Sequence, residues 1–140
     1  MPSQTSWWSQ YGWGDELAFR VPVYVLTYRQ RGSVEMARGT TFHFVRSPPQ
    51  EVLAQATADA RGKDVRVGGG VSTVRAFLKA GLVDRLRVAI VPSVLGRGIT
   101  LWADLRGLED GCDVITETAE SGIVHGRVGL AHPAVGDLLA

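Results

Sequence analysis

Apolar and polar residues follow regular patterns in the first half of the chain. Residues 21–29 (VPVYVLTYR) and 41–45 (TFHFV) have the Val, Tyr and Phe content of β-strands, and residues 30–40 between them indicate a loop. Residues 47–62 have the spacing of an amphipathic helix, with Ser47 as a plausible N-cap and Gly62 at the end. The predicted buried stripe of this helix is Val52, Leu53, Ala56 and Ala60.

The second half begins with a predicted short strand, residues 64–67, which runs into three glycines. Residues 71–84 predict a helix that ends near Gly81. Residues 85–96 predict a long strand, buried on both faces toward its end. The last two predicted strands, 112–120 and 122–133, form a hairpin through Glu120-Ser121-Gly122. The face of the helix expected to be buried holds Val74, Phe77 and Leu78.

This order of elements predicts an α/β sandwich, with a sheet that is parallel in its middle and antiparallel at its C-terminal edge. Residues 21–133 are expected to form one domain. Residues 1–20 are expected to form an aromatic N-terminal arm, and residues 134–140 a short tail. Packing of the arm on the domain through its tryptophans is the plainest interpretation.

Composition narrows the function classes. Fifteen Lys and Arg against 14 Asp and Glu give a net charge of +1, which disfavours nucleic acid as the main partner. No apolar run is long enough to cross a membrane, and the N-terminus lacks a signal-peptide pattern, so a soluble cytoplasmic protein is expected. The single cysteine, Cys112, excludes an internal disulfide, and the three histidines lack the spacing of metal ligands, so no metal site is expected.

Glycine is over-represented, with 17 residues in 140, and three of these stand together at residues 68–70. Glycines between a strand and a helix let the backbone approach a ligand, and the N–H groups of the following helical turn attract phosphate. The hydroxyls of Ser72 and Thr73 add donors on that turn. An empty strand-to-helix turn is the plainer alternative. The stretch is not a Walker A loop, which needs Lys after the glycines, nor a Rossmann fingerprint, whose last glycine is replaced by Thr73.

The stretch VGGGVSTVRAFLKAGLVDRLRVAIVPSVLGRGITLW, residues 67–102, resembles the C-terminal reductase domain of riboflavin biosynthesis (the RibD C-terminal domain family). That family has the dihydrofolate reductase-like fold, a three-layer α/β sandwich. The combination of GGG-x-S-T, AGLVD and VPSVLGRG carries the resemblance, which extends from about Trp13 to about Leu130. It implies an NADPH-dependent reductase acting on a small pterin- or pyrimidine-like heterocycle, and a homodimer.

The resemblance also implies two groups of cofactor-binding residues. The glycine turn would hold the pyrophosphate, and the end of strand 21–29 would lie beside the adenosine ribose and its 2′-phosphate, with Arg29 as the natural partner of the phosphate. A solvated cation is the alternative for Arg29. The loop at residues 95–98 is expected on the same side of the sheet. The implied cofactor-binding residues are Leu26, Thr27, Tyr28, Arg29, Gly68, Gly69, Gly70, Val71, Ser72 and Thr73.

The chain departs from the family at its N-terminus, where the usual first third is not recognisable. The missing strand would lie between residues 41–45 and 64–67 and leave two inner strand edges unpaired. The substrate side belongs to that missing part, so no catalytic residue is assigned. Three hypotheses stay open: an NADPH-dependent reductase, a non-catalytic or truncated nucleotide-binding module of the same fold, and a structural or oligomerising domain.

Overall fold

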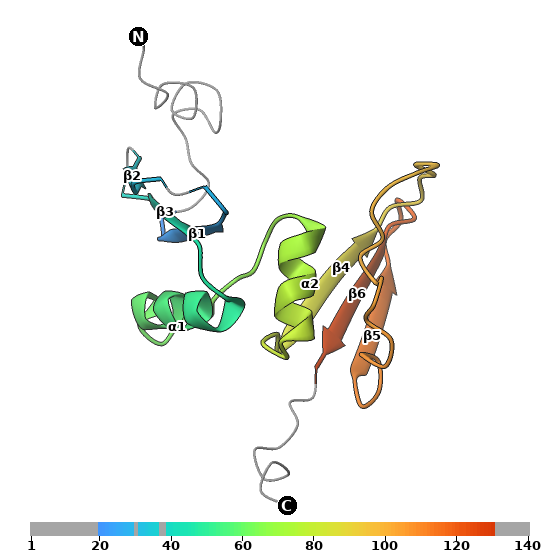
Figure 1. The fold of residues 1–140 in the computed structure, drawn as a ribbon. Coiled ribbons are helices and arrows are strands. Elements are labelled where there is room, and N and C mark those ends of the chain that lie inside the picture. The colour runs from blue at the N-terminus through green and yellow to red at the C-terminus, as the bar shows by residue number, and fades with distance from the viewer. Residues whose placement is uncertain (1–19, 30, 37–38, 131–140) are drawn as a thin grey trace, which may run out of the picture. The chain divides into compact units, whose positions relative to one another are not determined.

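A computed structural model of the chain describes residues 20–29, 31–36 and 39–130. The chain divides into two compact units, residues 1–66 and 67–140, and each unit contains one three-stranded sheet (Figure 1). The predicted tail, residues 134–140, and all but the last residue of the predicted arm lie outside the described residues.

The sheet of the first unit has the order β1-β3-β2. Strand β1 (Val23–Leu26) pairs in parallel with β3 (Thr41–Val45). Both predicted strands are confirmed, the first shorter than residues 21–29 and the second with its predicted bounds. The two-residue strand β2 (Val34–Glu35) pairs antiparallel with β3 inside the segment predicted to be a loop. Two residues are too few to leave a periodic pattern in the sequence.

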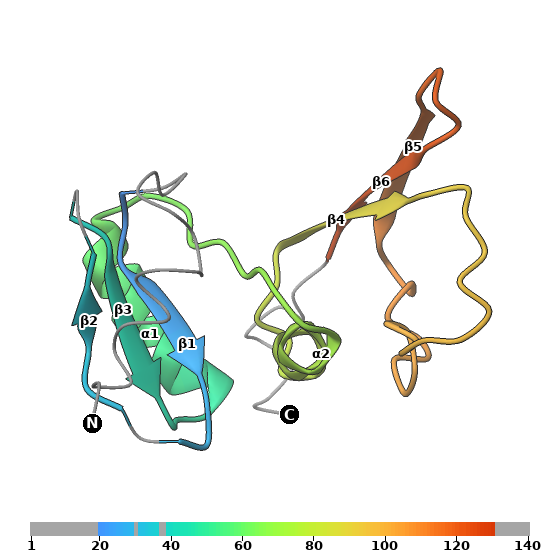
Figure 2. The same ribbon diagram turned by 90° about the horizontal axis from the view of Figure 1, so that it is seen from above.

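Helix α1 (Pro49–Ala60) lies along one face of this sheet (Figure 2). The predicted stripe is confirmed, because Val52 is buried and the other three residues are half-buried. The N-cap is Pro48 rather than Ser47. The extended backbone of Pro48 (ψ 155°) and the proline at the first helical position start the helix without any side-chain cap. Arg61 and Gly62 then end it with positive φ.

A tyrosine links this sheet to its helix. The hydroxyl of Tyr24 in β1 donates a hydrogen bond to the carboxylate of Asp59 in α1. That hydrogen bond, together with partial burial and the negative charge of Asp59, raises the pKa of Tyr24 from 10.0 to about 12. The Tyr24 ring stacks on the ring of His43 in β3, with centroids 5.0 Å apart.

The sheet of the second unit has the order β4-β6-β5 and is antiparallel throughout. Strand β4 covers Arg85–Ile90, β5 covers Asp113–Thr118 and β6 covers Val124–Gly129. The predicted hairpin between the last two strands is confirmed. Its turn is closed by a hydrogen bond from the Ala119 N–H to the Ile123 carbonyl, and Gly122 adopts a positive φ of 81°.

Helix α2 (Val71–Lys79) begins the second unit and buries Phe77 and Leu78, as predicted. It ends in a Schellman motif at Gly81, whose φ is 65°. The Gly81 N–H donates to the Leu78 carbonyl, and the Leu82 N–H donates to the Phe77 carbonyl. The predicted end of the helix is therefore confirmed.

Two strand predictions, one on each side of α2, are wrong. Residues 64–67 form no strand and belong to no sheet, since no described strand lies beside them to complete a hydrogen-bonded ladder. The long strand predicted at 85–96 ends at Ile90, where the β6 ladder ends, and Pro92 follows without an N–H group. Its end is not buried on both faces: Ile90 and Val91 are 59% and 57% exposed.

The predicted α/β class is confirmed by these two helices and six strands. The strand pairing differs from the predicted single sheet, which was expected to be parallel in its middle. The described strands form two sheets, and β1 with β3 is the parallel pair among them.

Candidate cofactor site

The glycine turn leads directly into helix α2. Gly70 is the N-cap residue, and its carbonyl accepts the first helical hydrogen bond, from the Val74 N–H at 3.2 Å. Gly69 has a φ of 107°, which a residue with a side chain rarely adopts. A Cβ atom placed on any of the three glycines would meet no other atom within 4 Å. The backbone of this turn is therefore open to a ligand.

The first turn of α2 is free to bind an anion. No side chain caps it, and it carries no acidic residue. Its N–H groups and the positive end of the helix dipole remain available for a phosphate oxygen. Ser72 is exposed and Thr73 is half-buried on this turn. The geometry fits the pyrophosphate role that the resemblance implies for residues 68–73.

The second predicted group lies at the carboxyl end of β1, in the first unit. The Thr27 N–H continues the ladder to the Val45 carbonyl at 2.9 Å, and the Thr27 hydroxyl accepts a hydrogen bond from the Arg29 N–H at 3.1 Å. Leu26 is half-buried, whereas Arg29 is exposed and Tyr28 is 89% exposed. The strand end thus presents an aromatic ring and a guanidinium to solvent.

The β1–β3 register adds a residue that the sequence reasoning missed. Leu26 is opposite Val45, so Arg46, directly after β3, follows the same sheet edge as Thr27. Carboxyl ends of parallel strands meet at one edge, and Arg46 is exposed there. Only the parallel register reveals this second cation, because Arg46 follows a predicted strand without any motif of its own.

The two predicted groups belong to different units of the chain, residues 26–29 to the first and residues 68–73 to the second. The cofactor-binding roles of both groups stay predictions. Each residue of the loop at 95–98 is exposed, and Gly96 adopts a φ of 73°. Its role in cofactor binding stays a prediction.

Cys112 and His43, which were also considered from the sequence, contact neighbouring groups of the chain. Cys112 is half-buried, and its thiol donates to the Leu108 carbonyl. His43 Nδ1 lies 3.1 Å from the Ser33 hydroxyl. Over the described ranges, no three His, Cys, Asp or Glu residues are grouped as metal ligands would be, and no helix has the length and apolar character needed to cross a membrane.

Comparison with known proteins now places the chain in a family. The family model described as "RibD C-terminal domain" matches residues 13–120, more than three quarters of the chain. The chain belongs to the RibD C-terminal domain family. This membership confirms the resemblance carried by the glycine turn and the segments after it. The α/β elements of both units are consistent with the dihydrofolate reductase-like fold expected for a RibD C-terminal domain.

Two individual proteins are similar to parts of this RibD C-terminal domain. An uncharacterized protein, YyaP of Bacillus subtilis (strain 168), is 41% identical over 63 residues, which cover 45% of this chain and 34% of YyaP. A crystal structure of a pyrimidine reductase-like protein from Corynebacterium diphtheriae is similar over 69% of this chain and 41% of that chain, with 18% identity and a TM-score of 0.43. The chain thus spans about a third to two fifths of the length of these proteins.

Proposed function

We propose that the chain serves as an NADPH-dependent reductase of a small pterin- or pyrimidine-like heterocycle. The observation that carries the proposal is the open glycine turn before an uncapped, acid-free helix N-terminus, found in a member of the RibD C-terminal domain family. The three glycines are not needed to begin a helix, since α1 begins without them. Together the glycine turn and the helix N-terminus make a site that favours a dianionic pyrophosphate.

Each group of residues has its own task in this proposal. The N–H groups of residues 68–73 bind the pyrophosphate, and the positive φ of Gly69 keeps that backbone accessible. Arg29 and Arg46, which follow the carboxyl ends of the parallel strands β1 and β3, bind the 2′-phosphate, because a guanidinium forms paired hydrogen bonds with phosphate oxygens. NADPH, when bound, supplies the hydride, and the chain supplies binding and orientation.

A non-catalytic nucleotide-binding module of the same fold is the second candidate. The same phosphate-binding geometry favours it, because neither the glycine turn nor the strand end contains a group assigned to proton transfer. The two candidates agree on cofactor binding and differ only in turnover. A single preparation of the chain therefore separates them.

The test measures binding first and turnover second. Isothermal titration of the whole chain with NADPH is expected to give saturable binding with a single site. NADPH oxidation is then followed at 340 nm with reducible pterins and aminopyrimidines. Consumption that depends on the heterocycle supports the reductase, whereas binding without consumption supports the module. Absence of binding at millimolar NADPH contradicts both.

We also propose that the chain forms a homodimer in the cytoplasm. The dimer is supported by the apolar surface exposed after β4, where Val94, Leu95 and Ile99 are 96%, 83% and 77% exposed. Apolar patches of this kind are typical of interaction surfaces. Light scattering is expected to give twice the mass of 15.1 kDa, and a monomer at high concentration would contradict the dimer. Cell fractionation tests the location.

A further inference from the structure

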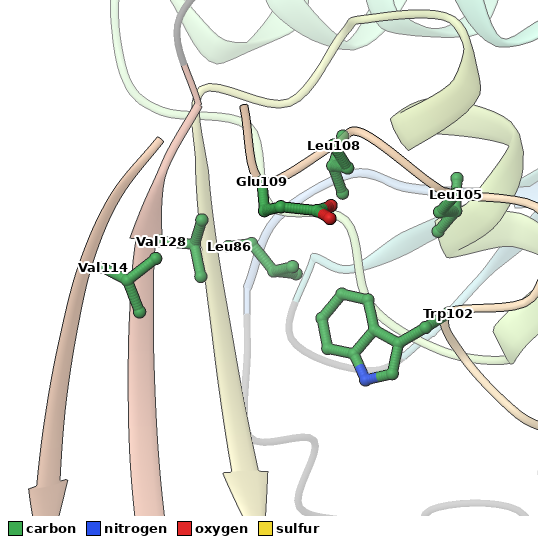
Figure 3. Close-up of a pocket in the computed structure, with 7 residues that line it drawn as sticks. All are labelled: Leu86, Trp102, Leu105, Leu108, Glu109, Val114 and Val128. Atoms are coloured by element: carbon green, nitrogen blue, oxygen red, sulfur yellow. The ribbon is translucent and has the colours of Figure 1, made fainter. Parts of the chain in front are cut away.

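The second unit contains a cavity of about 270 Å³ that none of the predicted cofactor-binding residues lines. It lies between the β4-β6-β5 sheet and the turns at residues 101–111 (Figure 3). Its volume is just under the usual range for ligand pockets, so it suits a ligand of one or two rings. The lining residues are Leu86, Trp102, Leu105, Leu108, Glu109, Val114 and Val128.

One wall of the cavity is a flat row of aliphatic side chains. Leu86 of β4 is opposite Val128 of β6, and Val114 of β5 is opposite the same valine, so the three lie in one line across the sheet. The Trp102 indole lies across the cavity from this row in Figure 3. Val114 is 58% exposed and Trp102 is 47% exposed, so the cavity opens to solvent. The space between an indole and an aliphatic wall fits a flat ring.

Glu109 supplies the charge of this otherwise apolar lining. Its carboxylate points into the space beside Trp102 and Leu105 (Figure 3). Across the described ranges, no side chain forms an ion pair or a hydrogen bond with this carboxylate. A carboxylate next to apolar walls favours a cation that brings an apolar body of its own, and the face of an indole also attracts cations.

The segment that carries Trp102 and Glu109 is held in place before any ligand arrives. The Arg75 guanidinium of α2 donates hydrogen bonds to the carbonyls of Thr100 and Leu101. The Cys112 N–H donates to the Glu109 carbonyl at 3.2 Å. A pocket whose walls are already ordered loses less conformational entropy when a ligand binds.

We propose that this cavity binds a small flat organic cation, such as an aromatic amidinium. The ring lies between Trp102 and the Leu86–Val128–Val114 row, and the cationic group forms a charge-assisted hydrogen bond with Glu109. The proposal is independent of NADPH binding, since it uses different residues. It predicts selection of cations over neutral molecules of the same shape.

The test follows the indole N–H signal of Trp102 by NMR during titration of the whole chain, with Trp102→Phe used to assign the signal. Benzamidine is expected to shift it saturably, and neutral benzamide to bind at least tenfold more weakly. Glu109→Gln is expected to remove this preference. The matched control, Glu120→Gln in the exposed hairpin turn, is expected to retain it.

Three results with these ligands and variants would overturn the proposal. The first is the absence of a saturable shift with benzamidine. The second is equal binding of benzamidine and benzamide, and the third is a preference that survives Glu109→Gln. A second variant, Val114→Lys, changes an exposed side chain and places an ammonium near Glu109. It is expected to weaken benzamidine at least fivefold, and unchanged affinity in this variant would also contradict the proposal.

Discussion

The N-termini of the two helices have the same backbone geometry but different chemistry. Pro48 and Gly70 are both extended N-cap residues, with φ of −61° and −63° and ψ of 155° and 156°, and neither helix has a side-chain cap. In α1, a proline at the first helical position removes one N–H, and Glu51 adds negative charge to the first turn. In α2, three glycines precede the helix and its first turn carries no acid.

This difference indicates which of the two helix N-termini is suited to bind an anion. Glu51 compensates the positive end of the α1 dipole from within the chain. The same end of α2 is left uncompensated and open. An uncapped helix start is common, but one whose approach is kept clear by glycines is suited to an external anion. Substitutions at and near the two helix N-termini test whether this difference controls NADPH binding.

The largest effect is expected from Gly69→Asp. A carboxylate at this position repels the pyrophosphate, and NADPH affinity is expected to fall by at least about 100-fold. Gly62→Asp is the matched control, because Gly62 also has a positive φ, 83°, and open surroundings, but lies after α1. Isothermal titration of both variants measures the effect. Equal affinities would show that the site lies elsewhere.

Arg29→Gln is expected to reduce the preference for NADPH over NADH by about tenfold, because a charge-assisted bond to the 2′-phosphate is lost. Affinity for NADH, which lacks that phosphate, is expected to stay unchanged. Arg61→Gln removes an exposed cation of the same unit and serves as the control. An identical loss for both cofactors would assign Arg29 a role other than recognition of the 2′-phosphate.

Thr73→Glu gives α2 the acid that α1 already has. Thr73 and Glu51 are both the third helical residue, so the change makes the two first turns alike. NADPH affinity is expected to fall about threefold at low salt, and less at high salt, through the helix dipole and direct repulsion. The reverse change, Glu51→Thr, is expected to leave affinity unaltered. An effect of Glu51→Thr equal to that of Thr73→Glu would remove the distinction between the helices.

The smallest expected effect concerns the side-chain hydrogen bonds that attach each helix to its neighbours. Hydrogen bonds from Arg75 attach α2 to its neighbouring loop, whereas the hydrogen bond from Tyr24 attaches α1 to β1. Because folding raises the pKa of Tyr24 from 10.0 to about 12, its contribution to stability is complete below pH 10 and is lost as the pH rises toward 12. Absorbance at 295 nm should detect the ionisation of Tyr24 as a late step, at higher pH than that of an ordinary tyrosine.

The late step is expected to disappear in Tyr24→Phe and to persist in Tyr28→Phe, which alters an exposed ring. Asp59→Asn should move the step to lower pH, since the largest cause of the shift is the hydrogen bond to Asp59. A late step that persists in Tyr24→Phe would show that another group causes it.

The sequence predicted those elements that local residues determine. The spacing of Phe77 and Leu78 defined the buried face of α2, and Gly81 marked its end. Non-local partners determined what the sequence could not predict. Residues 64–67 have the composition of a strand but no neighbour to pair with, and β2 exists only because Val34 lies beside Phe42 of β3.

The residues of the candidate site divide in the same way, into those that a local motif predicts and those that only the fold brings together. The glycine turn was predictable because one short motif carries it. Arg46 required the register of a parallel pair, and the cavity at Glu109 required residues from three strands and a turn to come together. Such groupings depend on contacts between residues far apart in the chain, which no local pattern records.

Amide NMR of the whole chain titrated with NADPH tests the central claim most directly. The account predicts saturable shifts of the backbone N–H signals of Gly69, Gly70 and Ser72, while the signals of Gln50 and Glu51 at the start of α1 stay in place. Saturable binding that leaves the α2 signals unmoved, or no binding at millimolar NADPH, would contradict it.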